Sequence, residues 1–178
     1  FLATVNFDHT TEDLSPRFLD RSWIITLAPS QISSESISES GLENAETIVS
    51  FKSLLSAFSP KPDDYIPEAV KLKWEKIQDI FRSCGHQIMP RNLKMINCYC
   101  LAGCRCMNQG TPESRFAPLD YAVSQKILPL INGSGIQYDD LMHKLADECA
   151  NMPICHQHIE RMMRFAENNM GYYQFFAR

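Results

Sequence analysis

Apolar residues recur at helical spacing through most of this chain, and this periodicity restricts the fold more than any other feature. Val70 is followed by Trp74, Ile77 and Phe81 at offsets of four, seven and eleven residues. Residues at these offsets share one face of an α-helix, and Gly85 is suited to end that helix. The sequence therefore predicts a helix here with one buried face.

Further helices are predicted from the same spacing over roughly residues 44–58, 90–100, 118–129, 138–149 and 154–170. Pro118 suits the first turn of its helix, whereas Pro129 should stop or kink that helix because proline removes a backbone donor and clashes with the preceding turn. Residues 132–135 read Asn-Gly-Ser-Gly and predict a turn. We expect the aromatic residues of the tail at 172–176 to pack back on the helices.

The first 28 residues have a different pattern from the rest of the chain. Apolar runs at residues 1–5 and 23–27 flank a polar turn and a short amphipathic piece, which predicts two short strands around a short helix. Residues 29–46 are rich in Ser and Glu and predict a connector. The predicted fold class is therefore mainly α, with a helical domain over residues 47–178 preceded by two short β-strands.

Composition and charge exclude several classes of protein. Hydrophobic residues make up 44% and charged residues 21% of the 178-residue chain, as in ordinary globular proteins. The net charge is -4, and no block is basic enough to form a nucleic-acid footprint on its own. No apolar run approaches the ~20 residues that span a bilayer, and no secretory signal is present, so we expect a cytoplasmic protein. The seven cysteines are expected to be free, reduced thiols.

The opening segment carries the residues that suggest a chemistry. Asn6 ends the first apolar run, and Arg17 and Arg21 lie one helical turn apart before the second. This order resembles the second half of the nucleotide-hydrolysing core of AAA+ proteins. The resemblance implies that Asn6 is the sensor 1 residue that orients the attacking water. It implies also that Arg21, with Arg17 as a second candidate, is the arginine finger that reaches the neighbouring subunit's nucleotide. An amide can donate and accept without charge, and a guanidinium presents forked donors to phosphate.

Two later segments extend this resemblance. The sequence MPRNLKMINCYC (89–100) is similar to the lid helix that carries the sensor 2 arginine, here Arg91. The sequence LDYAVSQKILPLINGSG (119–135) resembles the lid region of McrB-like AAA+ proteins, the motor subunits of modification-dependent restriction systems. The resemblance implies that residues 1–28 are the remnant of an AAA+ core and that residues 47–178 are the lid with a C-terminal extension.

The same resemblance implies a nucleotide and several partners for the parent protein. ATP or GTP with Mg²⁺ would be hydrolysed between subunits of a ring, which would translocate on DNA with a nuclease partner in defence against foreign DNA, without a membrane. The chain lacks the phosphate loop G-x-x-x-x-G-K-[ST] and the acidic strand end that holds Mg²⁺. We therefore expect this fragment alone to be inactive and to hold no nucleotide.

Simpler interpretations of the same residues remain open. Asn6 could cap the turn after a strand, and Arg17 and Arg21 could form a solvated helix face paired with Asp13 and Asp20. These readings would leave a stand-alone helical protein-interaction module, for which the opening segment is a docking strand.

A third hypothesis is a zinc-binding nucleic-acid module that uses Cys98, Cys100, Cys104 and Cys106. Zinc sites typically combine C-x₂₋₄-C pairs across a longer loop, whereas both pairs here are C-x-C. Successive residues of a helix step about 100° around its axis, so Cys98 should point away from the others. The residues CHQH (155–158) are expected to be a surface turn of the last helix, and we predict no metal site.

Overall fold

The computed structural model describes residues 3–5, 14–26, 50–59, 61–107 and 114–176. This part of the chain is mainly helical, as predicted, and contains the helices α1 (Pro16–Arg21), α2 (Phe51–Phe58), α3 (Glu68–Ser83), α4 (Pro90–Cys106), α5 (Ala117–Lys126), α6 (Ile136–Glu148) and α7 (Pro153–Asn168). Short 3₁₀ helices at Ser114–Phe116 and Leu128–Leu130 flank α5, and the strands β1 (Asn132–Ser134) and β2 (Tyr172–Gln174) form an antiparallel pair.

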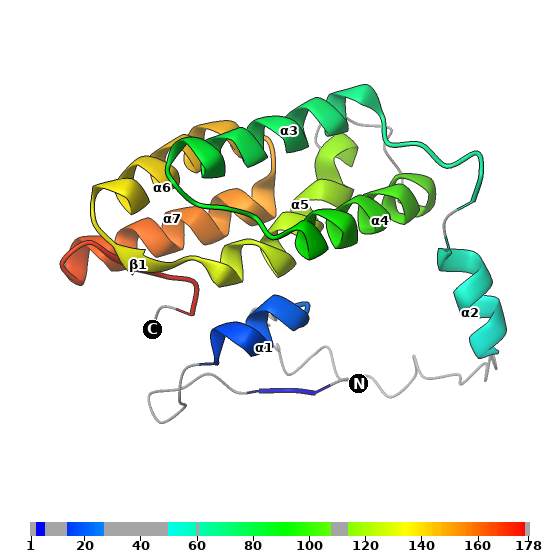
Figure 1. Cartoon of the computed structure of the whole chain (residues 1–178), viewed down its shortest axis with the longest axis horizontal. Coiled ribbons are helices and arrows are strands. Elements are labelled where there is room, and N and C mark those ends of the chain that lie inside the picture. The colour runs from blue at the N-terminus through cyan, green and yellow to red at the C-terminus, as the bar shows by residue number, and fades with distance from the viewer. Residues whose placement is uncertain (1–2, 6–13, 27–49, 60, 108–113, 177–178) are drawn as a thin grey trace, which may run out of the picture.

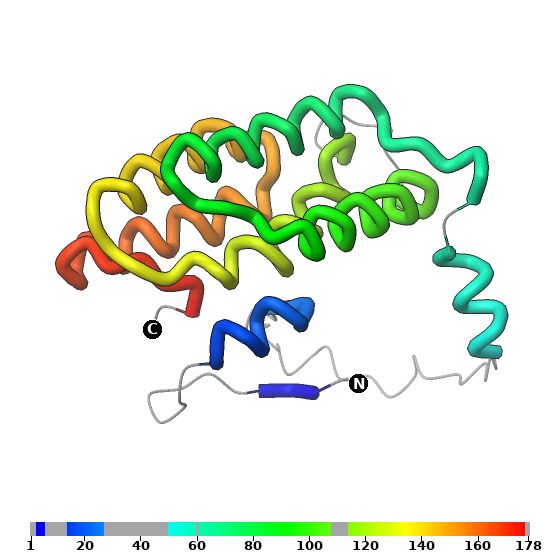
Figure 2. Tube along the Cα trace, in the orientation of Figure 1, coloured from blue at the N-terminus to red at the C-terminus, as the bar shows by residue number. Residues whose placement is uncertain are grey.

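Helices α3 to α7 form the body of the molecule (Figure 1). Helix α5 packs against both α4 and α7, while α6 packs against α3 and α7. Helix α1 lies on the body beside the 3₁₀ helix that follows α5. Helix α2 lies at one end of the molecule (Figure 2). It buries none of its residues, and Arg105 of α4 donates to the carbonyl of Ala57 at its C-terminal end.

The stripe predicted from the sequence is the buried face of α3. Val70, Trp74, Ile77 and Phe81 are between 0% and 6% exposed and belong to one continuous hydrophobic core with residues of α4 to α7. Fully burying one such side chain contributes about 1.5–3 kcal/mol. This face therefore holds α3 on the body and confirms the helix predicted over this segment.

Helix α5 is the central helix of the core. Leu119, Ala122 and Val123 are all 0% exposed, and the helix ends at Lys126, three residues before Pro129. The chain then tightens into the 3₁₀ helix that contains this proline. The predicted stop near Pro129 is confirmed, since proline cannot donate the hydrogen bond that would continue the α-helix.

A buried carboxylate joins α5 to the start of α7. Asp120 is 2% exposed and accepts hydrogen bonds from the backbone N–H groups of Ile154, at 2.9 Å, and Cys155, at 2.7 Å. These N–H groups lie in the first turn of α7, where backbone donors lack partners within the helix and where the helix dipole favours a negative charge. Asp120 thus caps a helix that lies far from it in sequence.

The segment predicted as a turn at residues 132–135 is instead a strand in its first three residues. Strand β1 pairs with β2 in the register Asn132 with Gln174, Gly133 with Tyr173 and Ser134 with Tyr172. A Cβ atom at position 133 would overlap the ring of Tyr138, so only glycine allows this close approach. The predicted packing of the aromatic tail is confirmed for two residues, because Tyr173 and Phe175 are buried.

The two strands expected near the N-terminus are not observed in their described residues, 3–5 and 22–26. The N–H group of Ile24 donates to the carbonyl of Gln125 at the end of α5, at 2.9 Å, and not to a neighbouring strand. The second apolar run therefore lies along a helix rather than in a sheet. No helix of the described residues is long and apolar enough to cross a membrane.

Candidate functional site

Helix α1 carries both candidate finger arginines and is too short to be stable on its own. The Oγ atom of Ser15 accepts a hydrogen bond from the N–H of Phe18 at 3.3 Å, and Pro16 occupies the first turn. These features start the helix locally, but a helix of six residues needs tertiary contacts to persist. Leu19, 8% exposed, is the buried residue of this helix.

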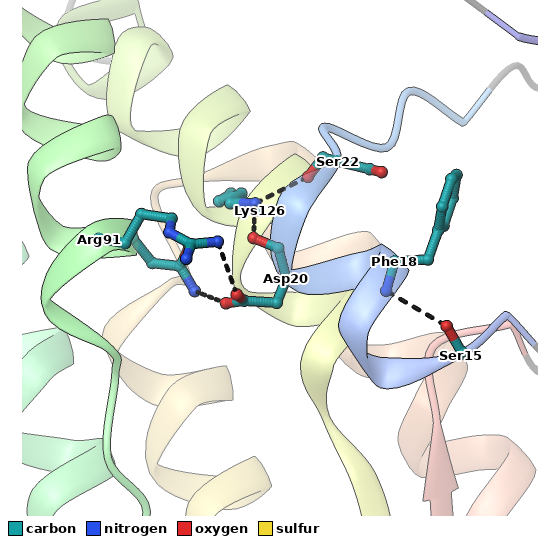
Figure 3. A network of polar contacts seen from close by, with 7 residues as sticks. Ser15, Phe18, Asp20, Ser22, Arg91 and Lys126 are labelled. Atoms are coloured by element: carbon teal, nitrogen blue, oxygen red, sulfur yellow. Dashed lines mark hydrogen bonds and ion pairs between the residues drawn. The ribbon is translucent and has the colours of Figure 1, made fainter.

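The carboxylate of Asp20 connects α1 to the first turn of α4 (Figure 3). The Nδ2 group of Asn92 donates to Asp20 Oδ1 at 2.9 Å, and Arg91 Nη1 lies 3.3 Å from Asp20 Oδ2. Asn92 is 0% exposed, whereas the Arg91 side chain is 56% exposed. The hydrogen bond to Asn92 is therefore the stronger fixing point, since exposed ion pairs contribute about 0–1 kcal/mol.

Lys126 holds the end of α1 through the backbone. Its ammonium donates to the carbonyl oxygens of Asp20, at 2.5 Å, and Ser22, at 2.9 Å, and the residue is only 1% exposed. These carbonyls lie at the C-terminal end of α1, where helix carbonyls lack partners and a positive charge is favoured. Burial lowers the pKa of Lys126, and the nearby Asp20 carboxylate partly opposes this effect.

The residues after α1 continue along the body. The ring of Trp23 stacks on Tyr99 of α4, with centroids 5.0 Å apart, and Ile24 donates to the end of α5 as described above. Helix α1 and residues 22–26 are consequently attached to both α4 and α5.

The predicted site residues differ in their exposure and in the residues they contact. Arg17 and Arg21 are both exposed on α1, and neither forms an ion pair with another described residue. Arg91 lies in the first turn of α4 and contacts α1 through Asp20. Asn6 and Asp13 lie outside the described residues. The alternative in which Asp20 pairs with Arg17 or Arg21 is wrong, because its carboxylate contacts Arg91 and Asn92 on α4.

Sequence reasoning missed Asn92 and Lys126 as the residues that fix α1. One signal was available for Lys126, which is the one charged residue of the otherwise uncharged stretch AVSQKILPLI (122–131). A lysine in such a stretch is costly to bury unless its ammonium has partners. No comparable signal marked Asn92.

The cysteines do not gather into a site. Cys100 is buried in α4, whereas Cys98 and Cys106 are exposed, as expected for successive positions around a helix. Burial raises the pKa of Cys100 to about 12, and the neighbouring Cys104 adds to this effect. Within the described ranges no three His, Cys, Asp or Glu side chains are placed to hold a metal ion. Cys155, expected at a surface turn, is instead fully buried at the start of α7, where Asp120 binds its N–H group.

Fold and contacts together define a helical domain with a short N-terminal helix docked on it. Residues 43–172 match DUF8727, a domain of unknown function, and the chain belongs to this family. No curated protein and no solved structure matches the chain. The matched span includes Arg91, Asn92 and Lys126, whereas α1 lies outside it.

Proposed function

We propose that this chain is the C-terminal part of an AAA+ nucleoside triphosphatase of the McrB-like type. In this proposal the helical domain is the lid, and α1 is the helix that presents an arginine finger to the nucleotide of a neighbouring subunit. The parent protein is a ring motor that uses ATP or GTP with Mg²⁺ and translocates on DNA with a nuclease partner.

The observation that carries the proposal is the contrast between the two sides of α1. One side carries the buried Leu19 and is fixed to the body by Asp20 and by the backbone contacts of Lys126. The other side presents Arg17 and Arg21 to solvent without a described carboxylate partner. An arginine finger needs a guanidinium that stays available for phosphate and a fixed helix that orients this side chain, and α1 provides both.

The residues of the chain fit one part of a nucleotide site. Exposed arginines can reach a phosphate that is held elsewhere, whereas the sequence has no phosphate loop of its own. The bound nucleotide with Mg²⁺ supplies the phosphoryl group that passes to water. Arg21 stabilises the charge that develops on the phosphate oxygens, and Asn6 orients the water through its amide.

In this proposal Arg91 couples α1 to the lid. Its contact with Asp20 is long and exposed, and Asn92 holds the same carboxylate independently. Arg91 can therefore exchange Asp20 for a phosphate oxygen without releasing α1. This exchange is the proposed role of Arg91 as sensor 2.

The test is nucleotide hydrolysis by the polypeptide that carries this chain. Arg21→Ala should lower turnover by about 10³-fold or more, the range known for arginine fingers, while nucleotide binding is retained. Mixing this variant with a phosphate-loop variant should restore part of the activity, because each subunit then supplies what the other lacks. Arg82→Ala is the matched control, since Arg82 is exposed on α3 and pairs with Asp79 of the same helix.

Turnover equal to wild type in Arg21→Ala would remove Arg21 from the finger role. The absence of a phosphate loop within about 200 residues upstream of Phe1, a span set by ordinary domain length, would refute the ATPase proposal as a whole.

A protein-interaction module is the second candidate, and α2 is the observation that favours it. Phe51, Leu54, Leu55 and Phe58 share one face of α2 and are 44% to 75% exposed. An exposed apolar face of this kind is typical of helices that dock on a partner. Hydrolysis by the parent protein that survives Leu55→Ser but not Arg21→Ala would favour the ATPase over this alternative.

A further inference from the structure

A groove of about 720 Å³ lies between residues 24–26 and the helices α5 and α7. Ile24 lines the groove from the N-terminal segment, and Ile154, His158, Arg161 and Arg164 line it from α7. None of the described residues that line the groove is Asp or Glu. The groove therefore combines apolar surface with positive charge that its own lining does not neutralise.

Arg161 is the central cation of this groove. Its Nη2 group donates to the carbonyl of Phe175 at 2.8 Å, and its guanidinium lies 5.5 Å from the centroid of the Phe175 ring. Its Nε atom is buried and has no hydrogen-bond partner among the described residues. Burial lowers the pKa of Arg161. Among the described residues no carboxylate pairs with this partly buried guanidinium, and an anion in the groove would lower the cost of its burial.

Arg164 adds a second positive charge one helical turn further along. Its only described ion pair, with Glu160, is 3.8 Å long, and the Arg164 side chain is 71% exposed. His158 is neutral at pH 7, because burial and the neighbouring Arg161 lower its pKa to about 4. The lining consequently carries the charge of two guanidinium groups.

The charge and shape of the groove select a class of ligand. A carboxylate would match one guanidinium, whereas a phosphomonoester carries roughly -1.5 to -2 at neutral pH and matches two. Arginine forks also suit the several oxygens of a phosphate group. Small-molecule sites typically have volumes of roughly 300–1,000 Å³, which includes this groove.

We propose that the groove between residues 24–26, α5 and α7 binds a small phosphomonoester with an apolar or aromatic body. The phosphate lies on Arg161 and Arg164, and the body lies against Ile24 and Ile154. This site is separate from the finger residues of α1, so it does not depend on the function proposed above.

Calorimetric titration of the 178-residue chain with phenyl phosphate, inorganic phosphate and phenol tests the proposal. Phenyl phosphate should bind more tightly than inorganic phosphate, because only the ester has a body for the apolar surface of the groove. Phenol should not bind measurably, because it lacks the anion.

Variants identify where the probe binds. Arg161→Ala should weaken binding of phenyl phosphate by about 10- to 100-fold, as expected for losing hydrogen bonds to a charged group. Arg161→Lys should recover part of this loss, since it keeps the charge without the fork. Arg164→Ala changes a side chain that is 71% exposed and should also weaken binding, whereas Arg82→Ala should not.

Two outcomes would overturn the proposal. One is the absence of phenyl phosphate binding at millimolar concentration. The other is binding that is equally strong in wild type, Arg161→Lys and Arg164→Ala. Either result is independent of whether the parent protein hydrolyses nucleotide.

Discussion

Replacing Lys126 by Met tests how α1 is held on the helical body. Methionine has a similar length and remains compatible with a buried site, but it removes the ammonium that donates to the carbonyls of Asp20 and Ser22. The buried Leu19 and the hydrogen bond from Asn92 are unchanged by this substitution. The substitution therefore isolates the contribution of the buried cation.

The magnitude follows from these two hydrogen bonds. Hydrogen bonds to charged groups contribute about 1.5–3 kcal/mol each, so two contribute about 3–6 kcal/mol. Methionine avoids the cost of burying an ammonium, which is the main cause of the lowered pKa of Lys126. We allow about 1–2 kcal/mol for this gain and expect docking of α1 to weaken by about 1–5 kcal/mol.

Hydrogen exchange of backbone amides measures this opening directly. The N–H of Ile24 is bonded to Gln125 only while this segment is docked. Since about 1.4 kcal/mol corresponds to a factor of ten, its protection should fall by about 5- to 4,000-fold in Lys126→Met. Amides of α3 should be unchanged, and Lys71→Met, at an exposed position of α3, is the matched control.

Wild-type protection of Ile24 in Lys126→Met would refute the reasoning. It would mean that the remaining contacts of α1, the Asn92 hydrogen bond among them, suffice to hold this helix, and that the buried ammonium contributes nothing net.

Two further predictions concern the stability of the body. Asp120→Ala should lower the free energy of unfolding, measured by urea denaturation, by about 3 kcal/mol, because two buried N–H groups of α7 lose a charged acceptor. The control Asp79→Ala, at an exposed position, should lower it by about 0.5 kcal/mol or less. The pKa of His158 is lowered from 6.5 in the unfolded chain to about 4 in the folded protein, so between these pH values the unfolded chain binds more protons. The neutral imidazole therefore contributes its full stability above pH 6.5, and this contribution is lost as the pH falls towards 4. Between pH 7 and pH 4 the wild type should lose up to about 3 kcal/mol more unfolding free energy than His158→Gln. Equal pH dependence of the two proteins in parallel urea titrations would contradict this assignment.

The helical body could be predicted because its signals are local. The stripe from Val70 to Phe81 places four large side chains on one face, and Pro90, Pro118 and Pro129 mark where helices begin or end. Both kinds of signal act within a few residues of the chain.

The contacts that fix the candidate site could not be predicted, because they join residues far apart in sequence. Lys126 meets the carbonyls of Asp20 and Ser22 across more than a hundred positions, and Asn92 meets Asp20 across 72. Strand β1 was missed for the same reason, since a three-residue strand is defined by its partner and not by its own pattern. Of the predicted site residues, Arg17 and Arg21 share α1 and Arg91 reaches that helix through Asp20.

The way Lys126 holds α1 bears on how freely that helix can change in sequence. The ammonium binds main-chain carbonyls, which every amino acid provides, so substitutions at positions 20 and 22 leave this anchor intact. A change of side chain at either position would alter what α1 presents to its surroundings, while the ammonium would still have both carbonyls to bind.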